Sequence, residues 1–268
     1  MKRYDHKLCI APMMDYTDTH FRYFLRLLSQ DIFLYTEMIS ADALIHGHRN
    51  MLLKFDSSEH PIGLQIGGSS IQKMADAAAI GQDYGYDEIN LNIGCPSPRV
   101  QKGNFGASLM ADSQLVSKII SNIKTKIQIP VTVKCRLGID DQDIEKDLKT
   151  FIKSCIDAGA DLLIIHARKA WLNGISAKDN RVLPEINYQA VYDIKNYAKE
   201  TEIIINGEIN SYSDIKNHLK YVDGVMLGRL IQNNPFCLKD VDSLFYNETN
   251  KYIISERTIQ DYFSFIRP

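Results

Sequence analysis

The sequence predicts an α/β protein with a (β/α)8 TIM barrel, on three observations. Eight short, apolar and β-branched segments are bounded by Gly, Pro or Asp, as buried strands are. Amphipathic helical patterns lie between most of them, and strands that alternate with helices form a parallel sheet. The eight units occupy roughly 230 of the 268 residues, and a closed barrel of this kind typically needs about 250.

The expected strands follow one another in series along the chain. In order, they are KLCIAPM (7–13), FLYTEM (33–38), PIGLQIGG (61–68), EINLNIG (88–94), PVTVKCR (130–136), LLIIHAR (162–168), EIIING (202–207) and GVMLGR (224–229). An open, doubly wound sheet is the alternative, but it usually carries a G-x-G-x-x-G turn after its first strand. The turn after the first strand reads PMMDYTD, so the barrel is favoured.

Three of the intervening segments show clear helical patterns. Segment 111–126 places apolar side chains every four residues, and segment 143–160 carries a similar stripe. The second stripe ends at Gly159, a residue suited to the left-handed position after a helix. Segment 211–221 begins with Ser211, which we expect to be a helix N-cap.

Composition narrows the class of protein. No apolar run reaches 18 residues and the N-terminus lacks the apolar stretch of a signal peptide, so we expect a cytoplasmic protein without a membrane span. Five cysteines are scattered without a C-x-x-C pair, so neither a metal site nor a disulfide framework is expected. The net charge is −2, whereas nucleic-acid binders often carry a clear positive excess.

The alternation of side chains along the strands predicts a polar cavity. One face of each strand is apolar, and the other turns polar toward the C-terminal end, where barrel active sites lie. The converging residues are Gln65, Asn92, Lys134, His166 and Asn206. A single buried Gln or His is more often a satisfied core residue, but burying a lone polar group costs roughly 1–3 kcal/mol. Five such residues therefore need a polar ligand or each other.

The ends of the last two strands indicate a phosphate site. They read NGEI (206–209) and LGRL (227–230), and loops at these places usually bind phosphate in such barrels. Gly207 and Gly228 would let backbone N–H groups approach, and Arg229 can add a charge-assisted contact. The alternative is that the glycines only relieve crowding. Because no dinucleotide glycine fingerprint occurs, a phosphate here favours flavin mononucleotide (FMN) over a resident dinucleotide.

Several longer motifs carry a family resemblance. They are APMMDYTD, TEMI, QIGG, INLNIGCPSPRVQKGNFGASLM, VKCRLGI, HARKAWLNGISAKDNR, NGEI and GVMLGR. In this order they resemble the tRNA-dihydrouridine synthases, flavin enzymes that reduce uridine in tRNA, over about residues 7–237. Segment 166–181 looks like the branch that modifies D-loop uridines 20 and 20a.

The resemblance implies a role for each matching position. The residues that would line the flavin at the end of the first strand are Pro12, Met13 and Met14. Those that would contact its ring are Gln65, Lys134 and His166. Those that would hold its phosphate are Asn206, Gly207, Glu208, Gly228 and Arg229. Cys95 would be the catalytic acid, and the residues that would contact tRNA or its target uridine are Asn92, Lys178 and Arg181. NADPH or NADH would be the transient reductant.

The chemistry of a thiol suits the role implied for Cys95. Hydride transfer to carbon 6 of uracil leaves negative charge at carbon 5, which must then receive a proton. A thiol with its reference pKa of about 8.5 is mostly protonated at neutral pH, whereas a carboxylic acid would be mostly ionised. Lys134, a positive charge facing the cavity, would stabilise the anionic edge of a reduced flavin.

A basic segment after the sixth strand would overhang the cavity. Arg168, Lys169, Lys178 and Arg181 lie there with Trp171 among them, as a flipped base and its phosphates would need. The alternative is a solvated loop with chance charges.

We expect two regions and a monomer. Residues 1–237 would form the catalytic barrel, and residues 238–268 would begin a helical tRNA-binding domain that is incomplete in this chain. Its helix carries an apolar stripe, Ile259, Phe263 and Ile266, that needs a partner. Two other functions stay open, namely an FMN-dependent barrel that reduces a free pyrimidine or small enone, and an RNA-binding remnant that has lost catalysis.

Overall fold

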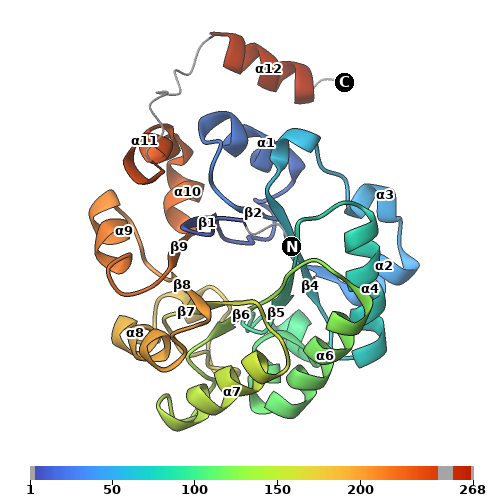
Figure 1. Ribbon diagram of the computed structural model, residues 1–268, viewed down its shortest axis with the longest axis vertical. Helices are drawn as coiled ribbons and strands as arrows, with labels where there is room; N and C mark the ends of the chain where they lie inside the picture. The colour runs from blue at the N-terminus through green and yellow to red at the C-terminus, as the bar shows by residue number, and fades with distance from the viewer. Residues whose placement is uncertain (1–3, 247–255, 267–268) are drawn as a thin grey trace.

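Parallel strands form a barrel in the computed structural model, which describes residues 4–246 and 256–266 (Figure 1). The strands are β1 (Leu8–Ile10), β2 (Leu34–Tyr35), β3 (Ile39–Ser40), β4 (Ile62–Gly67), β5 (Glu88–Asn92), β6 (Val131–Arg136), β7 (Leu162–His166), β8 (Glu202–Asn206) and β9 (Gly224–Leu227). Their order is β1-β9-β8-β7-β6-β5-β4-β2, and β3 also pairs with β4. A parallel bridge between Cys9 and Phe33 closes the ring. The expected barrel is confirmed.

The second expected strand is interrupted. Tyr35 pairs with Gly63 and Ile39 pairs with Ile66, so this side advances one residue more than β4 does. Such an extra residue is a bulge. At the bulge the Thr36 hydroxyl, in place of a backbone carbonyl, accepts a hydrogen bond from the backbone N–H of Gln65 at 3.0 Å.

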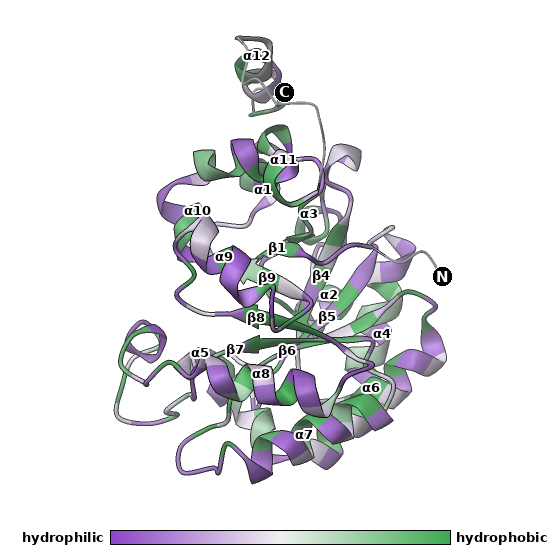
Figure 2. Cartoon of the chain, turned by 60° about the vertical axis from the view of Figure 1, so that its left-hand side comes forward, coloured by the Kyte–Doolittle hydropathy of each residue, from purple (hydrophilic) through white to green (hydrophobic). Residues whose placement is uncertain are grey.

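The helices surround the strands in Figure 1, and Figure 2 shows green strands inside helices that carry both purple and green residues. The α-helices are α1 (Thr19–Leu28), α2 (Ala41–His46), α3 (Arg49–Leu52), α4 (Ile71–Asp83), α5 (Pro98–Lys102), α6 (Ser113–Lys126), α7 (Lys146–Asp157), α8 (Tyr188–Tyr197), α9 (Tyr212–His218), α10 (Arg229–Asn233), α11 (Val241–Phe245) and α12 (Glu256–Ile266). Short 3-10 helices are η1 (Ser57–Glu59), η2 (Gly106–Ala111), η3 (Asp179–Arg181) and η4 (Pro235–Asp240).

The three helices expected from periodicity are present as α6, α7 and α9. Asp112 caps α6 by accepting a hydrogen bond from the Leu115 N–H at 2.9 Å. Gly159 follows α7 with a φ of 97°, in the left-handed region that favours glycine. Ser211 caps α9 by accepting from the Asp214 N–H, as the sequence predicts.

Alternation along the strands separates two cores. The outward side chains of β6, such as Val131 and Val133, pack against the helices. A second apolar cluster fills the interior of the barrel and includes Phe33, Tyr35 and Ile164. The polar residues that the sequence places on the inner face therefore lie above or beside this apolar filling.

The segment after β9 stays attached to the barrel. Leu238, Val241 and Phe245 belong to the main core, so the packing continues beyond the expected division at residue 237. In Figure 1, α12 lies outside the ring next to α1, and Phe265 stacks on Tyr23 with ring centroids 3.9 Å apart.

The outer side of α12 remains apolar. Ile259 and Phe263 are 50% and 48% exposed, and Tyr262 instead faces α1. Of the expected helical extension 238–268, residues 247–255 and 267–268 lie outside the described residues.

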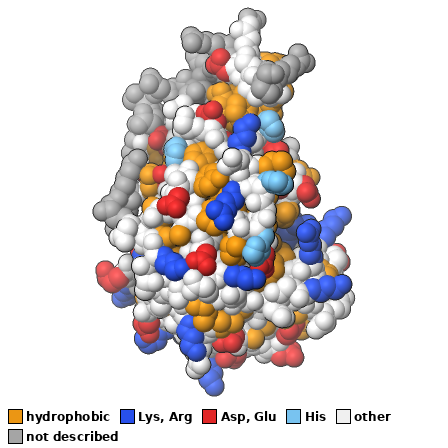
Figure 3. Space-filling model, turned by 90° about the vertical axis from the view of Figure 1, so that its right-hand side faces the viewer, with side chains coloured by type: hydrophobic (Ala, Val, Ile, Leu, Met, Phe, Trp, Pro, Cys, Tyr) orange, Lys and Arg blue, Asp and Glu red, His pale blue; other side chains and the backbone are white. Residues whose placement is uncertain are grey.

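Charge is spread over the outer surface. Figure 3 shows Lys and Arg mixed with Asp and Glu over the right-hand side of the molecule in Figure 1. Within residues 4–246 and 256–266, none of the helices has the length and apolar character needed to cross a membrane.

Candidate active site at the mouth of the barrel

A cavity of about 500 Å³ opens at the C-terminal ends of the strands. This size falls within the range of small-molecule sites, roughly 300–1,000 Å³. All of the candidate site residues line it except Lys178, which is exposed nearby. The sequence therefore predicted the wall of this cavity closely, because the ends of parallel strands meet at one rim.

Cys95 is held in a turn that its own neighbours define. The Asn92 side-chain oxygen accepts from the backbone N–H groups of Gly94 at 3.2 Å and Cys95 at 3.0 Å. The Cys95 carbonyl accepts from the Ala107 N–H at 2.9 Å. A Cβ at Gly106, where φ is 72°, would lie 2.6 Å from that carbonyl. Glycine is thus required for the close approach that fixes the half-buried thiol.

Lys134 is a cation inside the cavity with few partners. Its Nζ donates to Asn206 Oδ1 at 3.0 Å, and the Asn206 amide donates in turn to the Met226 carbonyl at 2.8 Å. Burial, followed by the neighbouring charge of Arg136, lowers the pKa of Lys134 to about 8. The side chain therefore remains mostly protonated at neutral pH and favours an anionic ligand beside it.

His166 is neutral, because burial and nearby positive charges lower its pKa as they lower that of Lys134. Burial and the positive charges of Arg136 and Lys134 lower the pKa of His166 well below its ordinary value. Its ring lies against Gly207, where φ is 126° and a Cβ would be 2.8 Å from His166 Cδ2. Gly207 therefore does relieve crowding. At Gly228 a Cβ would meet no atom closer than 3.7 Å, so space is open there.

Glu208 organises the rim where a phosphate is expected. Its φ is 49°, unusual for a residue other than glycine, and its carboxylate forms ion pairs with Arg168 at 2.8 Å and Arg229 at 3.2 Å. Arg229 thus faces the cavity with a carboxylate already beside it.

The basic loop after β7 is less basic at its surface than its sequence suggests. Arg168 is 4% exposed because it pairs inside the protein with Glu208. Lys169 donates to the Gln142 carbonyl at 2.6 Å. Lys178 and Arg181 are exposed, so these two remain as the cations that a large substrate can reach.

Arg136 is the residue whose role the sequence did not reveal. It is 3% exposed and donates to three carbonyl oxygens, those of Gly94 at 3.0 Å, Lys169 at 2.9 Å and Asn180 at 2.9 Å. It therefore ties the turn of Cys95 to the loop after β7. Its place two residues after Lys134, on the same inner face, was the signal available in the sequence.

The site as a whole combines binding and proton transfer. The cations at its wall outnumber the acids, the neutral imidazole can donate a hydrogen bond, and the thiol sits on a rigid turn above the strands. Such a set can hold an anionic ligand below and deliver a proton to a second molecule above.

Comparisons with known proteins agree with this arrangement. The family model described as dihydrouridine synthase matches residues 9–261. The tRNA-dihydrouridine(20/20a) synthase of Synechocystis sp. is 51% identical over 243 residues, 91% of this chain and 73% of that protein. Those of Shewanella oneidensis and Escherichia coli O6:H1 are 45% and 47% identical, covering 97% and 91% of this chain and 77% and 74% of their own lengths. With the barrel and its polar mouth, these matches show that the chain belongs to the dihydrouridine synthase family of flavin-dependent oxidoreductases.

Proposed function

We propose that this protein reduces uridine to 5,6-dihydrouridine in the D-loop of tRNA, at positions 20 and 20a. FMN is the bound cofactor, and NADPH or NADH is the transient reductant. The observation that carries the proposal is the thiol of Cys95 above a cavity that also contains Lys134 and His166. The names of the relatives from three organisms support the choice of substrate.

The residues present fit FMN. The wall of the cavity carries Lys134, Arg136 and Arg229, which suits a phosphate and an anionic ring edge. Space is open at Gly228, so backbone can approach a ligand there. The apolar side chains that would lie against the flavin are Pro12, Met13 and Met14.

Gln65 has capacity for one ring contact. Its amide donates to Asn90 at 2.8 Å and accepts from Asn92 at 2.8 Å. A carboxamide carries two N–H donors, so one N–H is left for a ligand.

The reaction needs one hydride and one proton. FMN, when bound, supplies a hydride to carbon 6 of uracil. Cys95 donates its thiol proton to carbon 5, so that the 5,6 double bond becomes a single bond with two new C–H bonds. Lys134 offsets negative charge at the floor of the cavity, and the neutral ring of His166 donates an N–H to the same region.

The rim of the cavity meets the tRNA in this proposal. Asn92, which accepts from the backbone N–H of Cys95, contacts the target uridine, while Lys178 and Arg181 contact the phosphate backbone. In this proposal α12 adds further tRNA contacts. The protein acts as a cytoplasmic monomer, which light scattering of the purified protein at several concentrations tests.

Purified protein and tRNA that lacks dihydrouridine test the proposal. The protein should bind FMN with its yellow absorbance, oxidise NADPH or NADH, and produce dihydrouridine at positions 20 and 20a, read by reverse transcription or mass spectrometry. Reduction of free uracil or of a small enone at a comparable rate would favour a small-molecule reductase. Binding of tRNA without any dihydrouridine would favour a protein that has lost catalysis.

A further inference from the structure

A continuous line of hydrogen bonds runs through the interior of the barrel. It starts at the N-terminal end of β5 with Glu88 and ends at the turn of Cys95. The residues along it are Glu88, Thr132, Asn90, Gln65 and Asn92. We call these five residues the interior ladder. Glu88, Thr132 and Asn90 are fully buried and Gln65 is 1% exposed, so water does not substitute for any missing partner.

Every bond of the interior ladder points the same way. Asn92 donates to Gln65 at 2.8 Å, and Gln65 donates to Asn90 at 2.8 Å. Asn90 donates to the Thr132 hydroxyl at 2.8 Å, and this hydroxyl donates to Glu88 Oε1 at 2.5 Å. Side-chain amides can be turned over at no cost in shape, so this common direction needs a cause.

The backbone N–H groups of Gly94 and Cys95 favour this direction at the upper end of the line, and Glu88 favours it at the lower end. A carboxylate has only acceptor oxygens, so each hydroxyl that meets Glu88 must donate to it. Tyr35 also donates to Glu88 Oε1 at 2.8 Å, and His6 lies 2.8 Å from Oε2. Burial acts to lower the pKa of His6, but the hydrogen bond and charge of Glu88, together with the charges of Glu202 and Asp5, leave this pKa raised. Two hydroxyl groups, of Thr132 and Tyr35, and the imidazole of His6 thus all face the Glu88 carboxyl group.

The direction of the line has a consequence at its upper end. Because the Asn92 amide nitrogen is committed to Gln65, its oxygen must face the turn and accept from the N–H of Cys95. With the amide turned over, an N–H would face that N–H, and the turn would lose its hydrogen bond.

We propose that Glu88 is a positioning residue for Cys95, acting through the direction it imposes on the interior ladder. The proposal rests on the proposed function, in which the thiol of Cys95 must meet a ring carbon. A merely structural carboxylate is a poor alternative, since an apolar residue of similar volume is often as stable or more so in place of buried ions.

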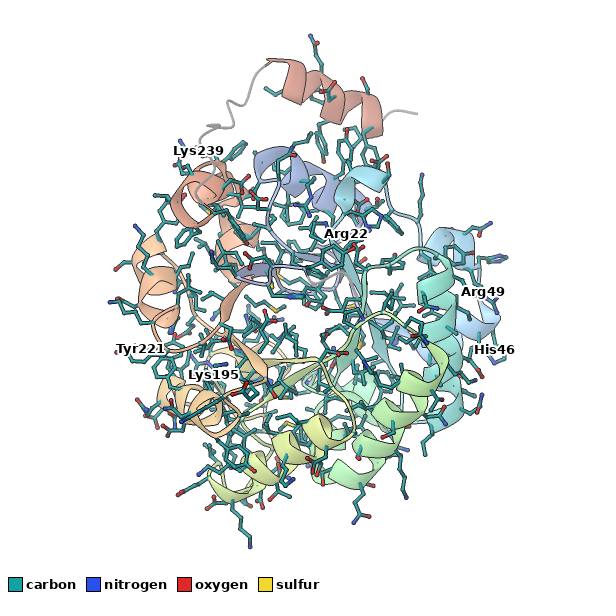
Figure 4. The ribbon with its side chains drawn as sticks, in the orientation of Figure 1. Arg22, His46, Arg49, Lys195, Tyr221 and Lys239 are labelled. Carbon is teal, nitrogen blue, oxygen red and sulfur yellow. The ribbon has the colours of Figure 1, made fainter. Side chains whose placement is uncertain are left out.

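Two substitutions remove the directing group in different ways. Glu88→Gln keeps the shape but adds a donor, so both directions become possible. Thr132→Val keeps the volume and cuts the line between Asn90 and Glu88, and Thr132→Ser restores the hydroxyl. The matched control is Glu59→Gln. Glu59 is also fully buried and accepts from Arg22 at 2.6 Å, but it belongs to η1 beside α1 and not to the interior ladder. Its partner Arg22 is labelled in Figure 4.

Alkylation of Cys95 by iodoacetamide measures the position of the thiol without using enzyme activity. Peptide mass spectrometry gives the rate at Cys95 relative to Cys237, the other half-buried cysteine. We expect this ratio to change at least threefold in E88Q and T132V, and to return toward the original value in T132S. In single turnovers of reduced enzyme with tRNA, E88Q should lower the rate at least tenfold with little change in KM, since misplacement of about 1 Å can cost roughly 10²-fold.

Each outcome decides the proposal. It is overturned if both ladder variants fold and keep the original ratio, or if E59Q shifts the ratio as much as they do. Should E88Q fail to fold, the pair T132V and T132S gives the answer alone. Retention of full activity by Cys95→Ala would remove the proton-donor role from the proposed function, yet the alkylation ratio would still show whether Glu88 positions that segment.

Discussion

Replacement of Arg136 by Met removes the clamp between the turn of Cys95 and the loop after β7. The change keeps an unbranched aliphatic stem but removes the guanidinium, so that three carbonyl oxygens, in one buried and two partly buried hydrogen bonds, lose their donor. Hydrogen bonds from a charged group contribute about 1.5–3 kcal/mol each, so the three together amount to about 4.5–9 kcal/mol.

The burial of the guanidinium opposes this gain. Desolvation lowers the pKa of Arg136 to about 10, from above 12 in water, which corresponds to a cost of about 3 kcal/mol. After this cost is subtracted from the hydrogen-bond contribution, the native arginine still stabilises the protein by several kcal/mol. We therefore expect R136M to reduce the free energy of unfolding by about 4 kcal/mol, the range expected when a buried hydrogen-bond network is broken.

Two measurements on the same variant test this value. Urea unfolding followed by circular dichroism gives the loss of stability, with Arg99→Met, an exposed arginine, as the control. Trp171 is the single tryptophan of the chain, and its backbone N–H is held by Asn180, so its fluorescence reports on the loop itself. R136M should make Trp171 more accessible to iodide. A loss of stability below 1 kcal/mol with unchanged quenching would refute the conclusion that Arg136 joins the turn of Cys95 to the loop after β7.

Five further substitutions have expected outcomes. Cys95→Ala should leave flavin binding and its reduction by NADPH intact while lowering dihydrouridine formation by about 10²–10⁴, measured in single turnovers. Lys134→Met should abolish a rise in stability with pH. The folded pKa of about 8 lies below the unfolded value of about 10.4, so the unfolded state binds more protons between these two values. The difference from the native protein in the free energy of unfolding, from urea titrations across this pH range, should reach about 1–3 kcal/mol. Gly207→Ala should destabilise the protein by about 1–3 kcal/mol and weaken FMN binding in fluorescence titration, because its Cβ would press on His166. Lys178→Ala and Arg181→Ala should each raise the KM for tRNA and flatten its salt dependence, with little effect on NADPH oxidation.

The wall of the candidate active site could be predicted because it depends on local geometry. Alternation along β6 and β7 places Lys134 and His166 on the inner face whatever surrounds them. The helices α6 and α9 could be predicted for the same reason, since apolar spacing and the N-caps are properties of single segments.

The partners of the inner residues could not be predicted in this way. Arg136 and Lys134 share a strand and a face, yet one reaches the carbonyl of Asn180, 44 positions away, and the other faces the cavity. Arg168 reads as an RNA contact in the sequence but pairs with Glu208 inside the rim.

The periodicity of the sequence therefore predicted the barrel, the face of the sheet on which each strand side chain lies, and the position of Cys95 after β5. These features follow from repeating backbone geometry alone. The hydrogen-bond partner of each polar group depended on which distant residues lie beside it in the closed barrel. Closure brings Glu88, Thr132 and Gln65 from three strands into one line of hydrogen bonds. A buried donor or acceptor is stabilised only by its actual partner, and that partner is set by packing across the sheet rather than by spacing along the chain.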